Sequence, residues 1–288
     1  MDALDYCAGI GGWEVELERR GITGHGIENA RWPREARTVN GLSTVWGDLE
    51  TLPQDVLMRY GRQIVVGSFP CQPFSQNIKG KDPMDDPRAH LMRTGLEHVL
   101  AARPQVVCLE NVSKAGKLMV TLGEHLTEAG YSFDVRVINA ADFGLPQARK
   151  RALLVARRDG APIAWPEPTH SKDGADGRKP WVSMAEALGR TFDGPQAWAN
   201  TLPSPAVVGS FKPEMHAPPR YRGYGDVSRQ NDPGAVECSL AERMLLQGFP
   251  SSWKLAGPKS AQDLQVGNAI PPVLADVALT AAGLPCPS

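Results

Sequence analysis

The sequence lacks long apolar runs and has no excess of charge of one sign. No apolar run approaches the roughly 18 residues that a membrane-spanning helix needs, and the first five residues carry no basic segment of the kind that opens an export signal. Lysine and arginine number 31, against 32 aspartate and glutamate residues. We therefore expect a cytoplasmic protein without membrane contact. An overall positive charge is excluded as the means of binding a polyanion, so any such contact needs a local patch.

Paired metal-ligand and disulfide patterns are also missing. The five cysteines are scattered, odd in number and never spaced as C-x-x-C: Cys7, Cys71, Cys108, Cys238 and Cys286. The six histidines form no H-E-x-x-H motif. A disulfide framework and a structural zinc are thus disfavoured, and a reducing compartment is favoured.

What the sequence does contain indicates an α/β protein. Of its 288 residues, 42% are hydrophobic and 22% are charged, a balance that favours a buried core over a disordered chain. Short apolar runs alternate with amphipathic stretches in the first half, as in α/β domains. The predicted strands cover residues 4–7, 24–28, 64–66, 106–109, 133–137 and 152–156, with a short segment at 45–49 and a helix at 13–20.

The composition and the periodicity of the sequence change in the second half of the chain. Ten prolines lie between residues 162 and 219, with little periodicity, which indicates a small irregular domain. A helix is predicted after Ser239 that ends at Gly248-Phe249-Pro250, and a last helix at 272–282. We expect a catalytic and cofactor-binding domain of residues 1–156 plus 260–288, and a small domain of residues 157–259 that holds a target-recognition region.

Polar or reactive residues stand where the predicted strands end: Asp5, Glu28, Asp48, Cys71 and Glu110. In an open parallel sheet, ligands bind at the carboxyl ends of the strands. The alternative is that these positions are polar only because loops are exposed.

The first of these strand ends runs into a glycine-rich turn, Asp5-x-x-x-Gly9-x-Gly11-Gly12, that precedes a helix. Glycines allow close backbone approach to a ligand, and a helix N-terminus offers unpaired N–H groups. The spacing differs from the dinucleotide fingerprint G-x-G-x-x-G. An acid that ends the second strand, as Glu28 does, is placed to accept hydrogen bonds from ribose hydroxyls, or is simply an exposed loop acid.

The segment Gly67-Ser68-Phe69-Pro70-Cys71-Gln72-Pro73 contains the candidate nucleophile. Cys71 follows a proline at the end of a buried strand, among turn formers and polar groups, where a thiolate can be stabilised. The other four cysteines are assigned to the usual role of buried, unreactive thiols.

Several ordered motifs resemble the DNA (cytosine-5)-methyltransferase family of bacteria and phages. They are Pro70-Cys71-Gln72-Pro73-Phe74-Ser75, Glu110-Asn111-Val112, Gln147-Ala148-Arg149-Lys150-Arg151, Gln247-Gly248-Phe249-Pro250 and Gly267-Asn268-Ala269-Ile270-Pro271-Pro272. With the glycine turn, the resemblance covers nearly the whole chain except residues 157–237. It implies a Rossmann-like S-adenosylmethionine-dependent methyltransferase fold with a small irregular target-recognition domain.

The resemblance also implies a set of catalytic roles. Cys71 would add to carbon-6 of cytosine, so that carbon-5 can take the methyl group of S-adenosylmethionine. Glu110 would bring a proton to the ring nitrogen and hold the exocyclic amine. Arg151 would hold the ring carbonyl, Arg149 would support the thiolate and flanking phosphates, and Asn111 would fix the loop that presents Glu110.

Cofactor contacts are implied for Asp5, Cys7, Gly9, Gly11, Gly12, Glu28, Asn29, Asp48, Leu49, Pro70, Leu91, Asn268 and Ala269. One position departs from the family pattern. Phenylalanine usually stacks on the adenine where this chain has Cys7, a smaller side chain that should weaken the contact unless another side chain fills the gap.

Double-stranded DNA is the implied partner, with the target base flipped out of the stack. Contacts are expected from Gln72, Ser75, Lys79, Lys81, Arg88, Arg220, Arg222 and Arg229. The loop 75–88 is a candidate lid, or an ordinary solvated loop because three aspartates balance its charge. Five positive charges at 149–158 form a dense basic cluster expected to contact phosphates.

The expected molecule is a monomer that methylates cytosine carbon-5 in a specific duplex sequence. Two alternatives remain: a catalytically silent DNA-binding homologue, and an RNA cytosine methyltransferase on the same fold.

Overall fold

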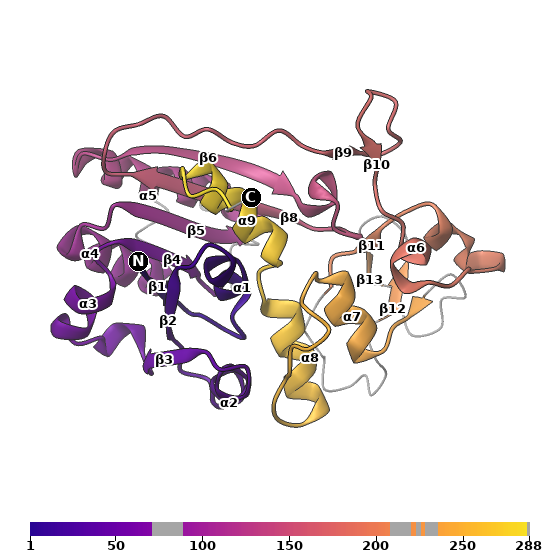
Figure 1. The fold of residues 1–288 in the computed structure, drawn as a ribbon, viewed down its shortest axis with the longest axis horizontal. Coiled ribbons are helices and arrows are strands. Elements are labelled where there is room, and N and C mark those ends of the chain that lie inside the picture. The colour runs from indigo at the N-terminus through magenta and orange to yellow at the C-terminus, as the bar shows by residue number, and fades with distance from the viewer. Residues whose placement is uncertain (71–88, 208–219, 223–225, 228–235, 287–288) are drawn as a thin grey trace. The chain divides into compact units, whose positions relative to one another are not determined.

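The fold centres on a seven-stranded sheet with the strand order β3-β2-β1-β4-β5-β8-β6 (Figure 1). Neighbouring strands from β3 to β5 pair in parallel, and β8 runs antiparallel to β5. The strands are β1 (Asp2–Tyr6), β2 (Thr23–Ile27), β3 (Ser43–Trp46), β4 (Ile64–Ser68), β5 (Val106–Val112), β6 (Ser132–Asn139) and β8 (Lys150–Arg157). The predicted α/β class is confirmed, because a mostly parallel sheet joined by helices is what alternating apolar and amphipathic segments form.

The computed structural model describes residues 1–70, 89–207, 220–222, 226–227 and 236–286, and only the backbone within 220–222 and 226–227. The chain divides into two compact units. Unit 1 comprises Met1–Ile138, Arg151–Pro166 and Leu274–Ser288, and unit 2 comprises Asn139–Lys150 and Glu167–Val273.

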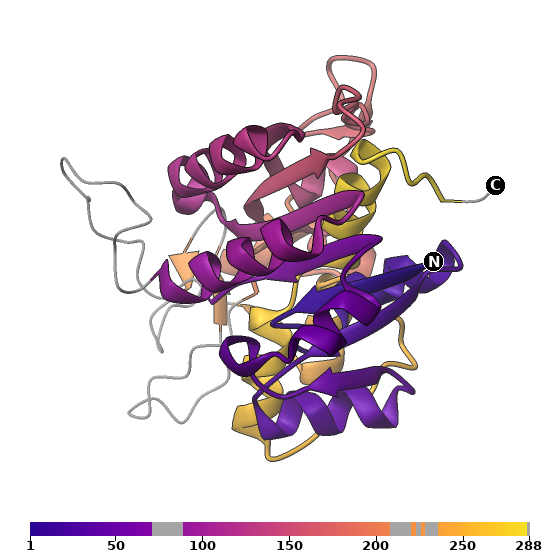
Figure 2. The same ribbon diagram turned by 90° about the vertical axis from the view of Figure 1, so that its left-hand side faces the viewer.

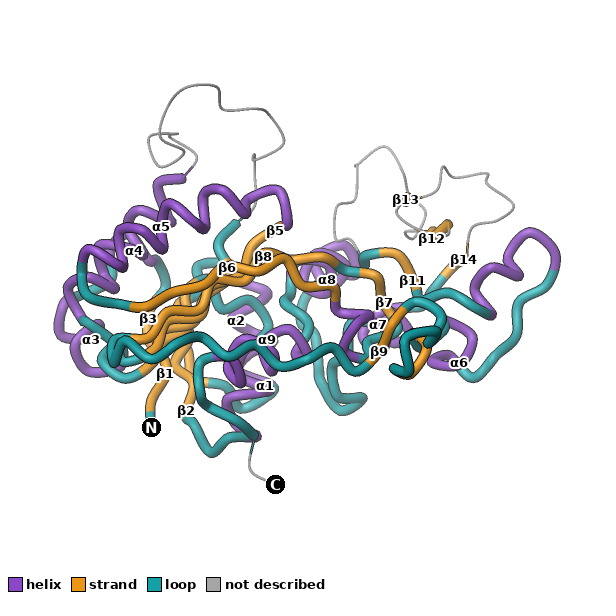
Figure 3. The backbone as a smooth tube through the Cα atoms, turned by 90° about the horizontal axis from the view of Figure 1, so that it is seen from above, coloured by secondary structure: helices purple, strands orange, loops and turns teal. Residues whose placement is uncertain are grey.

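Helices cover both faces of the sheet in unit 1. Leucine, methionine and valine side chains from α3 (Gln54–Tyr60), α4 (His90–Ala102) and α5 (Gly116–Glu128) pack with Leu4, Tyr6, Val65 and Val107 in one buried core. Figure 2 looks onto these three helices. On the opposite face lie α1 (Gly12–Arg19) and α9 (Pro272–Ala281), as Figure 3 shows, and α2 (Arg31–Val39) joins β2 to β3. Strands β4 and β5 are buried on both faces, which explains their continuous apolar sequences.

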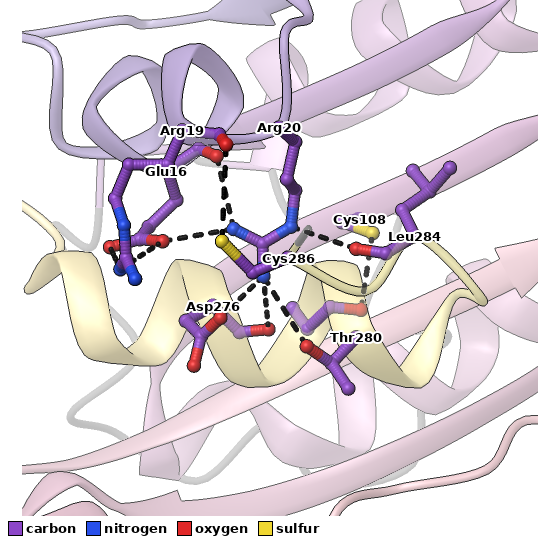
Figure 4. Close-up of polar contacts among 9 residues, drawn as sticks. Glu16, Arg19, Arg20, Cys108, Asp276, Thr280, Leu284 and Cys286 are labelled. Atoms are coloured by element: carbon purple, nitrogen blue, oxygen red, sulfur yellow. Dashed lines mark hydrogen bonds and ion pairs between the residues drawn. The ribbon is translucent and has the colours of Figure 1, made fainter. Parts of the chain in front are cut away.

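A buried arginine joins the end of α1 to α9 and to the segment after it (Figure 4). The Arg20 guanidinium donates to the Leu284 carbonyl at 2.7 Å and to the Glu16 carboxylate at 2.9 Å, and it pairs with Asp276. Its side chain is only 2% exposed. The predicted last helix is thus confirmed and is held on the sheet by a charge whose hydrogen-bond donors are satisfied, as a buried arginine requires.

Unit 2 consists of short elements. They are β7 (Gln147–Ala148), β9 (His170–Ser171), β10 (Lys179–Pro180), α6 (Met184–Leu188), β11 (Ser204–Pro205), β12 (Arg220–Arg222), β13 (Asp226–Val227), β14 (Val236–Glu237), α7 (Leu240–Leu246) and α8 (Lys259–Asn268). Helix α7 begins with a capping box in which Ser239 and Glu242 bond reciprocally to each other's backbone, as its sequence favours. The described part of the proline-rich segment is irregular, as expected.

Residues 139–150 and 260–273 lie in unit 2, whereas the sequence placed them with the catalytic domain, and residues 157–166 lie in unit 1, whereas the sequence placed them in the small domain. Pairing explains the difference: β7 pairs with β11, and the Gln147 side chain bonds to Leu246 and Gln247. A local sequence pattern does not reveal such long-range partners.

Candidate active site

The predicted strand ends lie along the same edge of the sheet. Tyr6 at the end of β1 pairs with Ile27 of β2 and Gly67 of β4, and Ser68 pairs with Glu110 of β5. The next residues along these strands, Cys7 and Glu28 among them, therefore emerge side by side. Of the expected strand-end residues, Glu28 and Glu110 follow or end paired strands at this edge, whereas Cys71 lies outside the described residues.

The glycine turn adopts backbone conformations that favour glycine. Gly9 has φ 55° and Gly11, which caps α1, has φ 96°. A Cβ at Gly9 would meet nothing within 4 Å, so open space lies over the turn. The N-cap residue of α1 is Gly11, so no N-cap side chain bonds to the first N–H groups of this helix.

Glu28 ties this turn to the second strand. One carboxylate oxygen accepts from the Gly9 N–H at 2.8 Å, and the other accepts from the Ala30 N–H at 2.8 Å. The residue is 8% exposed. Each oxygen retains a further lone pair, so Glu28 can hold the turn and still accept hydrogen bonds from a ligand.

Cys7 lies near three acidic residues, Glu28, Asp5 and Asp48. Its φ of 56° is left-handed, an uncommon and strained conformation for a residue with a Cβ. Burial and then the negative charges of Glu28, Asp5 and Asp48 raise the pKa of the Cys7 thiol. The thiol therefore stays protonated, in agreement with its assignment as unreactive.

The other expected cofactor residues of unit 1 lie near the same edge or in the core. Asp48 follows β3 and caps the short helix Leu49–Thr51 by accepting from the Glu50 N–H at 3.0 Å. Leu49 is buried and Leu91 is half-buried against the same core. Asn29 and Pro70 are exposed.

Asp5 occupies the predicted strand end, but its side chain is fully buried. Burial, and then the negative charge of Glu14, raise the pKa of Asp5 well above its ordinary 3.8. Glu14 pairs with the Arg37 guanidinium at 2.5 Å, which also donates to the Ser43 carbonyl. Sequence reasoning missed this cluster of two carboxyls and one guanidinium.

The glycines of β2 are the sequence signal for that cluster. A Cβ at Gly24 would overlap the Glu14 side chain, and a Cβ at Gly26 would overlap the Arg37 guanidinium. Glycine inside a strand often marks such a close approach. The pattern Thr23-Gly24-His25-Gly26-Ile27 thus makes room for two buried charges.

Glu110 and Arg151 form an ion pair near the end of β5. The Arg151 Nε lies 2.9 Å from a Glu110 carboxylate oxygen, with side-chain exposures of 15% and 7%. The antiparallel register of β5 and β8 brings them together, with Val112 opposite Arg151 and Glu110 opposite Leu153. Two expected catalytic residues are therefore in direct contact.

Asn111 contacts the neighbouring strand end. Its side-chain amide donates to the Phe69 carbonyl at 3.3 Å, and its oxygen accepts from the Val112 N–H at 2.8 Å. The family resemblance assigned to this residue the task of fixing the Glu110 loop. The structure adds that it holds the backbone that leads to Pro70.

A second contact to the same strand end was not expected. Trp13, the second residue of α1, donates its indole N–H to the Ser68 hydroxyl at 3.1 Å. Trp13 is 1% exposed. From the sequence, this tryptophan was predicted only to lie on one face of the helix at 13–20.

In unit 2, Arg149 is a buried centre of hydrogen bonds. Its guanidinium donates to the carbonyls of Val207 at 2.7 Å, Gly267 at 2.9 Å and Ala269 at 3.2 Å. The last two residues flank Asn268, which is exposed at the end of α8. At 2% exposure, Arg149 positions backbone segments, a task that the sequence analysis did not assign to it.

Gln147 and Gln247 extend this centre. Gln147 bonds to Gln247 at 2.7 Å and accepts from the Val207 N–H at 2.9 Å, and Gln247 donates to the Ala269 carbonyl at 2.7 Å. Both glutamines are fully buried. They stood in the motifs that carried the family resemblance, but their mutual contact was not anticipated.

Several predicted residues lie outside the described residues. They are Cys71, Gln72, Ser75, Lys79, Lys81, Arg88 and Arg229, together with the proposed lid 75–88; the side chains of Arg220 and Arg222 are likewise not described.

The predicted basic cluster at 149–158 is wrong as a single patch. Lys150–Arg157 is one extended strand, so its ends stand about 23 Å apart at 3.3 Å per residue. At the far end, Arg157 pairs with Asp159 and Arg158 donates to the Arg103 carbonyl. Sequence proximity does not become spatial proximity along a strand.

The remaining cysteines in the described residues are free thiols. Cys108 and Cys238 are buried, and burial raises the pKa of Cys238 to about 12. Within the described residues no cluster of histidine, cysteine and acidic side chains could hold a metal ion, and no helix is long and apolar enough to cross a membrane.

Comparison with known proteins identifies the family to which the chain belongs. The model of the C-5 cytosine-specific DNA methylase family matches residues 1–204 and 206–282. The chain belongs to this family. The expected resemblance is confirmed, and with it the activity class of a DNA cytosine-5 methyltransferase.

Individual relatives span most of this methylase. Type II methyltransferase M.NgoBI of Neisseria gonorrhoeae is 33% identical over 93% of the chain and 88% of its own length. Type II methyltransferase M1.HphI of Haemophilus parahaemolyticus is 29% identical over 94% of the chain and 84% of its own length.

Solved structures share the fold. Entamoeba histolytica methyltransferase EhMeth superposes with a TM-score of 0.71 at 15% identity, covering 98% of this chain and 97% of its own. A putative DNA modification methyltransferase encoded within an E. coli prophage superposes with a TM-score of 0.65 at 17% identity, covering 98% of each chain. The expected Rossmann-like methyltransferase fold is thereby confirmed.

Proposed function

We propose that this methylase transfers a methyl group from S-adenosylmethionine to carbon-5 of a cytosine flipped out of duplex DNA, through a covalent adduct of Cys71. The observation that carries the proposal is the Glu110–Arg151 pair at 2.9 Å. Glu110 stands on β5, the strand beside β4, and Arg151 stands on β8 on the other side of β5. The chain continues from the end of β4 through Phe69 and Pro70 to Cys71. The pair supports the proposal that an acidic group and a carbonyl-binding cation act together next to the strand that leads to Cys71.

The cofactor would bind at the glycine turn. Open space over Gly9, the uncapped N-terminus of α1 and the acids Glu28 and Asp48 match the needs of an adenosyl amino acid. Glu28 would accept hydrogen bonds from the ribose hydroxyls, and Asp48 would accept one from the adenine amine. When bound, S-adenosylmethionine supplies an electrophilic methyl group on a sulfonium.

On the base, the Cys71 thiolate would form a bond to carbon-6, and carbon-5 would take the methyl group as the methyl–sulfur bond breaks, so that S-adenosylhomocysteine is the leaving group. Glu110 would give the ring nitrogen a proton as electron density shifts into the ring, and Arg151 would hold the ring carbonyl. A base would then remove the carbon-5 proton, the bond between sulfur and carbon-6 would break to release the thiolate, and the ring nitrogen would return its proton to Glu110.

Asn111 would position the nucleophile segment through its bond to the Phe69 carbonyl. Arg149 would position Asn268 by holding the carbonyls on either side of it. The DNA contacts remain proposals that rest on the resemblance: Gln72, Ser75, Lys79, Lys81, Arg88, Arg220, Arg222 and Arg229.

The biological setting is also proposed. Curated relatives carry the name type II methyltransferase, which supports a role as the modification enzyme of a restriction–modification system. We further propose that the protein acts as a cytoplasmic monomer, because one chain supplies each group that the reaction needs.

The test is bisulfite sequencing of a plasmid from cells that express the protein. Protected cytosines within one recurring sequence are expected, and none in cells that express Cys71→Ser. Parallel assays of the purified protein on duplex DNA and on structured RNA separate the two nucleic acids. Methyl transfer to RNA alone would contradict the proposed substrate.

A further inference from the structure

The first turn of α1, which follows the glycine turn, and the strand end that leads to Cys71 are joined by a direct side-chain hydrogen bond. Trp13 follows the two glycines that open α1, so its position is fixed by the turn. Its indole nitrogen donates to the Ser68 hydroxyl at 3.1 Å. Ser68 ends β4 and stands two residues before Pro70.

The same strand end is held from the other side by β5. Ser68 pairs with Glu110 in the sheet, and the Asn111 side chain donates to the Phe69 carbonyl at 3.3 Å. Ser68 and Phe69 are therefore held both by α1, through Trp13, and by β5, through strand pairing and Asn111. The Asn111–Phe69 bond is buried, and in the part-buried Trp13–Ser68 bond the indole donor is only 1% exposed, so competing water has little access to either donor.

We infer that Trp13 and Ser68 are positioning residues that align the cofactor turn with the nucleophile segment. Methyl transfer needs the sulfonium methyl, carbon-5 and the Cys71 sulfur to be aligned, and small misplacements of reacting groups lower a rate steeply. The Trp13–Ser68 bond links α1, whose start is set by the glycine turn, to the end of β4, from which the chain continues to Cys71. This inference rests on the proposed function.

Two substitutions at one position separate this role from mere stability. Ser68→Ala removes the acceptor and leaves the indole N–H buried, whereas Ser68→Thr keeps a hydroxyl. Tyr131→Phe is the matched control, because it deletes another single buried hydrogen bond, from the Tyr131 hydroxyl to the Pro104 carbonyl at 2.8 Å, before strands β5 and β6 begin.

The measurements are the single-turnover rate of methyl transfer to duplex DNA, the affinity for S-adenosylhomocysteine, and the melting temperature. For Ser68→Ala we expect the rate to fall about tenfold, equivalent to about 1.4 kcal/mol, while S-adenosylhomocysteine affinity stays within about twofold of wild type, a span of about 0.4 kcal/mol. Ser68→Thr should restore most of the rate. Tyr131→Phe should lower the melting temperature without changing the rate.

An unchanged rate in Ser68→Ala, or an equal loss in Tyr131→Phe, would overturn the inference. A parallel loss of S-adenosylhomocysteine affinity would also overturn it, because Ser68 would then act through cofactor binding. Wild type serves as the reference for the proposed function: if it fails to methylate cytosine in DNA, the proposed function fails, independently of the Ser68 result.

Discussion

Replacing Arg37 by methionine should destabilise the protein far more than an ordinary arginine substitution. Arg37 and Glu14 pair at 2.5 Å with side-chain exposures of 0% and 1%. Arg37 also donates to the Thr44 hydroxyl at 2.9 Å and the Ser43 carbonyl at 2.7 Å. Removing it leaves the Glu14 carboxylate buried beside Asp5 without its cation.

Breaking a buried ion pair from one side costs about 3–5 kcal/mol. At about 2–4 °C per kcal/mol for a chain of this size, the melting temperature should fall by about 10 °C. Urea denaturation followed by circular dichroism gives the free energy of unfolding, and a thermal scan gives the melting temperature.

The same helix provides a matched control. Arg31 pairs with Glu35 at 2.9 Å, but these side chains are 74% and 45% exposed. Arg31→Met should therefore change the free energy of unfolding by less than about 0.5 kcal/mol.

A double substitution tests the cause of the loss. In Arg37→Met with Glu14→Leu, both charges are gone, and most of the lost stability should return because an apolar pair avoids the desolvation cost. If Arg37→Met alone costs less than about 1 kcal/mol, or if the double variant is no better than the single one, the reasoning is refuted.

Four further predictions follow from named contacts. Asp5→Asn should be more stable than wild type at neutral pH. In wild type the folded state holds a proton on Asp5, whereas the unfolded state loses that proton above the ordinary pKa of 3.8. The free energy of unfolding of wild type therefore falls by about 1.4 kcal/mol per pH unit between 3.8 and the raised pKa of the folded state. Equal pH profiles of unfolding for the two proteins would contradict this. Glu28→Gln should weaken S-adenosylmethionine binding at least about tenfold by calorimetry, because an amide cannot accept from both the Gly9 and Ala30 N–H groups and also from a ribose; unchanged affinity would place the ribose elsewhere. Glu110→Gln should lower the methyl-transfer rate at least about a hundredfold, with duplex affinity retained, because the group proposed as general acid is lost; a rate within about tenfold of wild type would remove Glu110 from proton transfer. Arg158→Gln should leave duplex affinity within about twofold in a titration at low salt, because this residue stands at the far end of β8 and donates to Arg103; a large loss would restore the basic cluster as a DNA contact.

The sequence was sufficient to predict the sheet and the edge at which the site lies. β-branched runs such as Ile64-Val65-Val66 form strands, and the polar residue that ends each run marks the carboxyl end. Because parallel strands end together, Glu28, Asp48 and Glu110 could be grouped from the sequence alone. Ordered motifs then indicated the chemistry.

Contacts between distant segments were not predictable in the same way. The alternation of β1 places Asp5 on the face opposite Leu4 and Tyr6, but the sequence does not say that Glu14 covers that face. The partners of Arg149 lie 58 to 120 residues away. Its expected role at the thiolate and phosphates therefore came from a motif alone, and its hydrogen bonds to three carbonyls became visible only in the folded chain.

The basic cluster illustrates a different kind of failure. Charged residues that are close in sequence are also close in space only where the backbone is compact, and an extended strand separates them. In the extended strand β8, Arg151 reaches Glu110 at one end, while Arg157 reaches Asp159 at the other. A strand prediction at 152–156 already contained the information needed to reject the patch.

The covalent adduct tests the central claim most directly. Purified protein is incubated with S-adenosylmethionine and duplex DNA in which the target cytosine is replaced by 5-fluorocytosine, and the products are separated under denaturing conditions and mapped by mass spectrometry. We predict a stable complex joined at Cys71 that retains the transferred methyl group, and none with Cys71→Ser. An adduct at another residue, or full methyl transfer to ordinary duplex DNA by Cys71→Ser, would contradict the account.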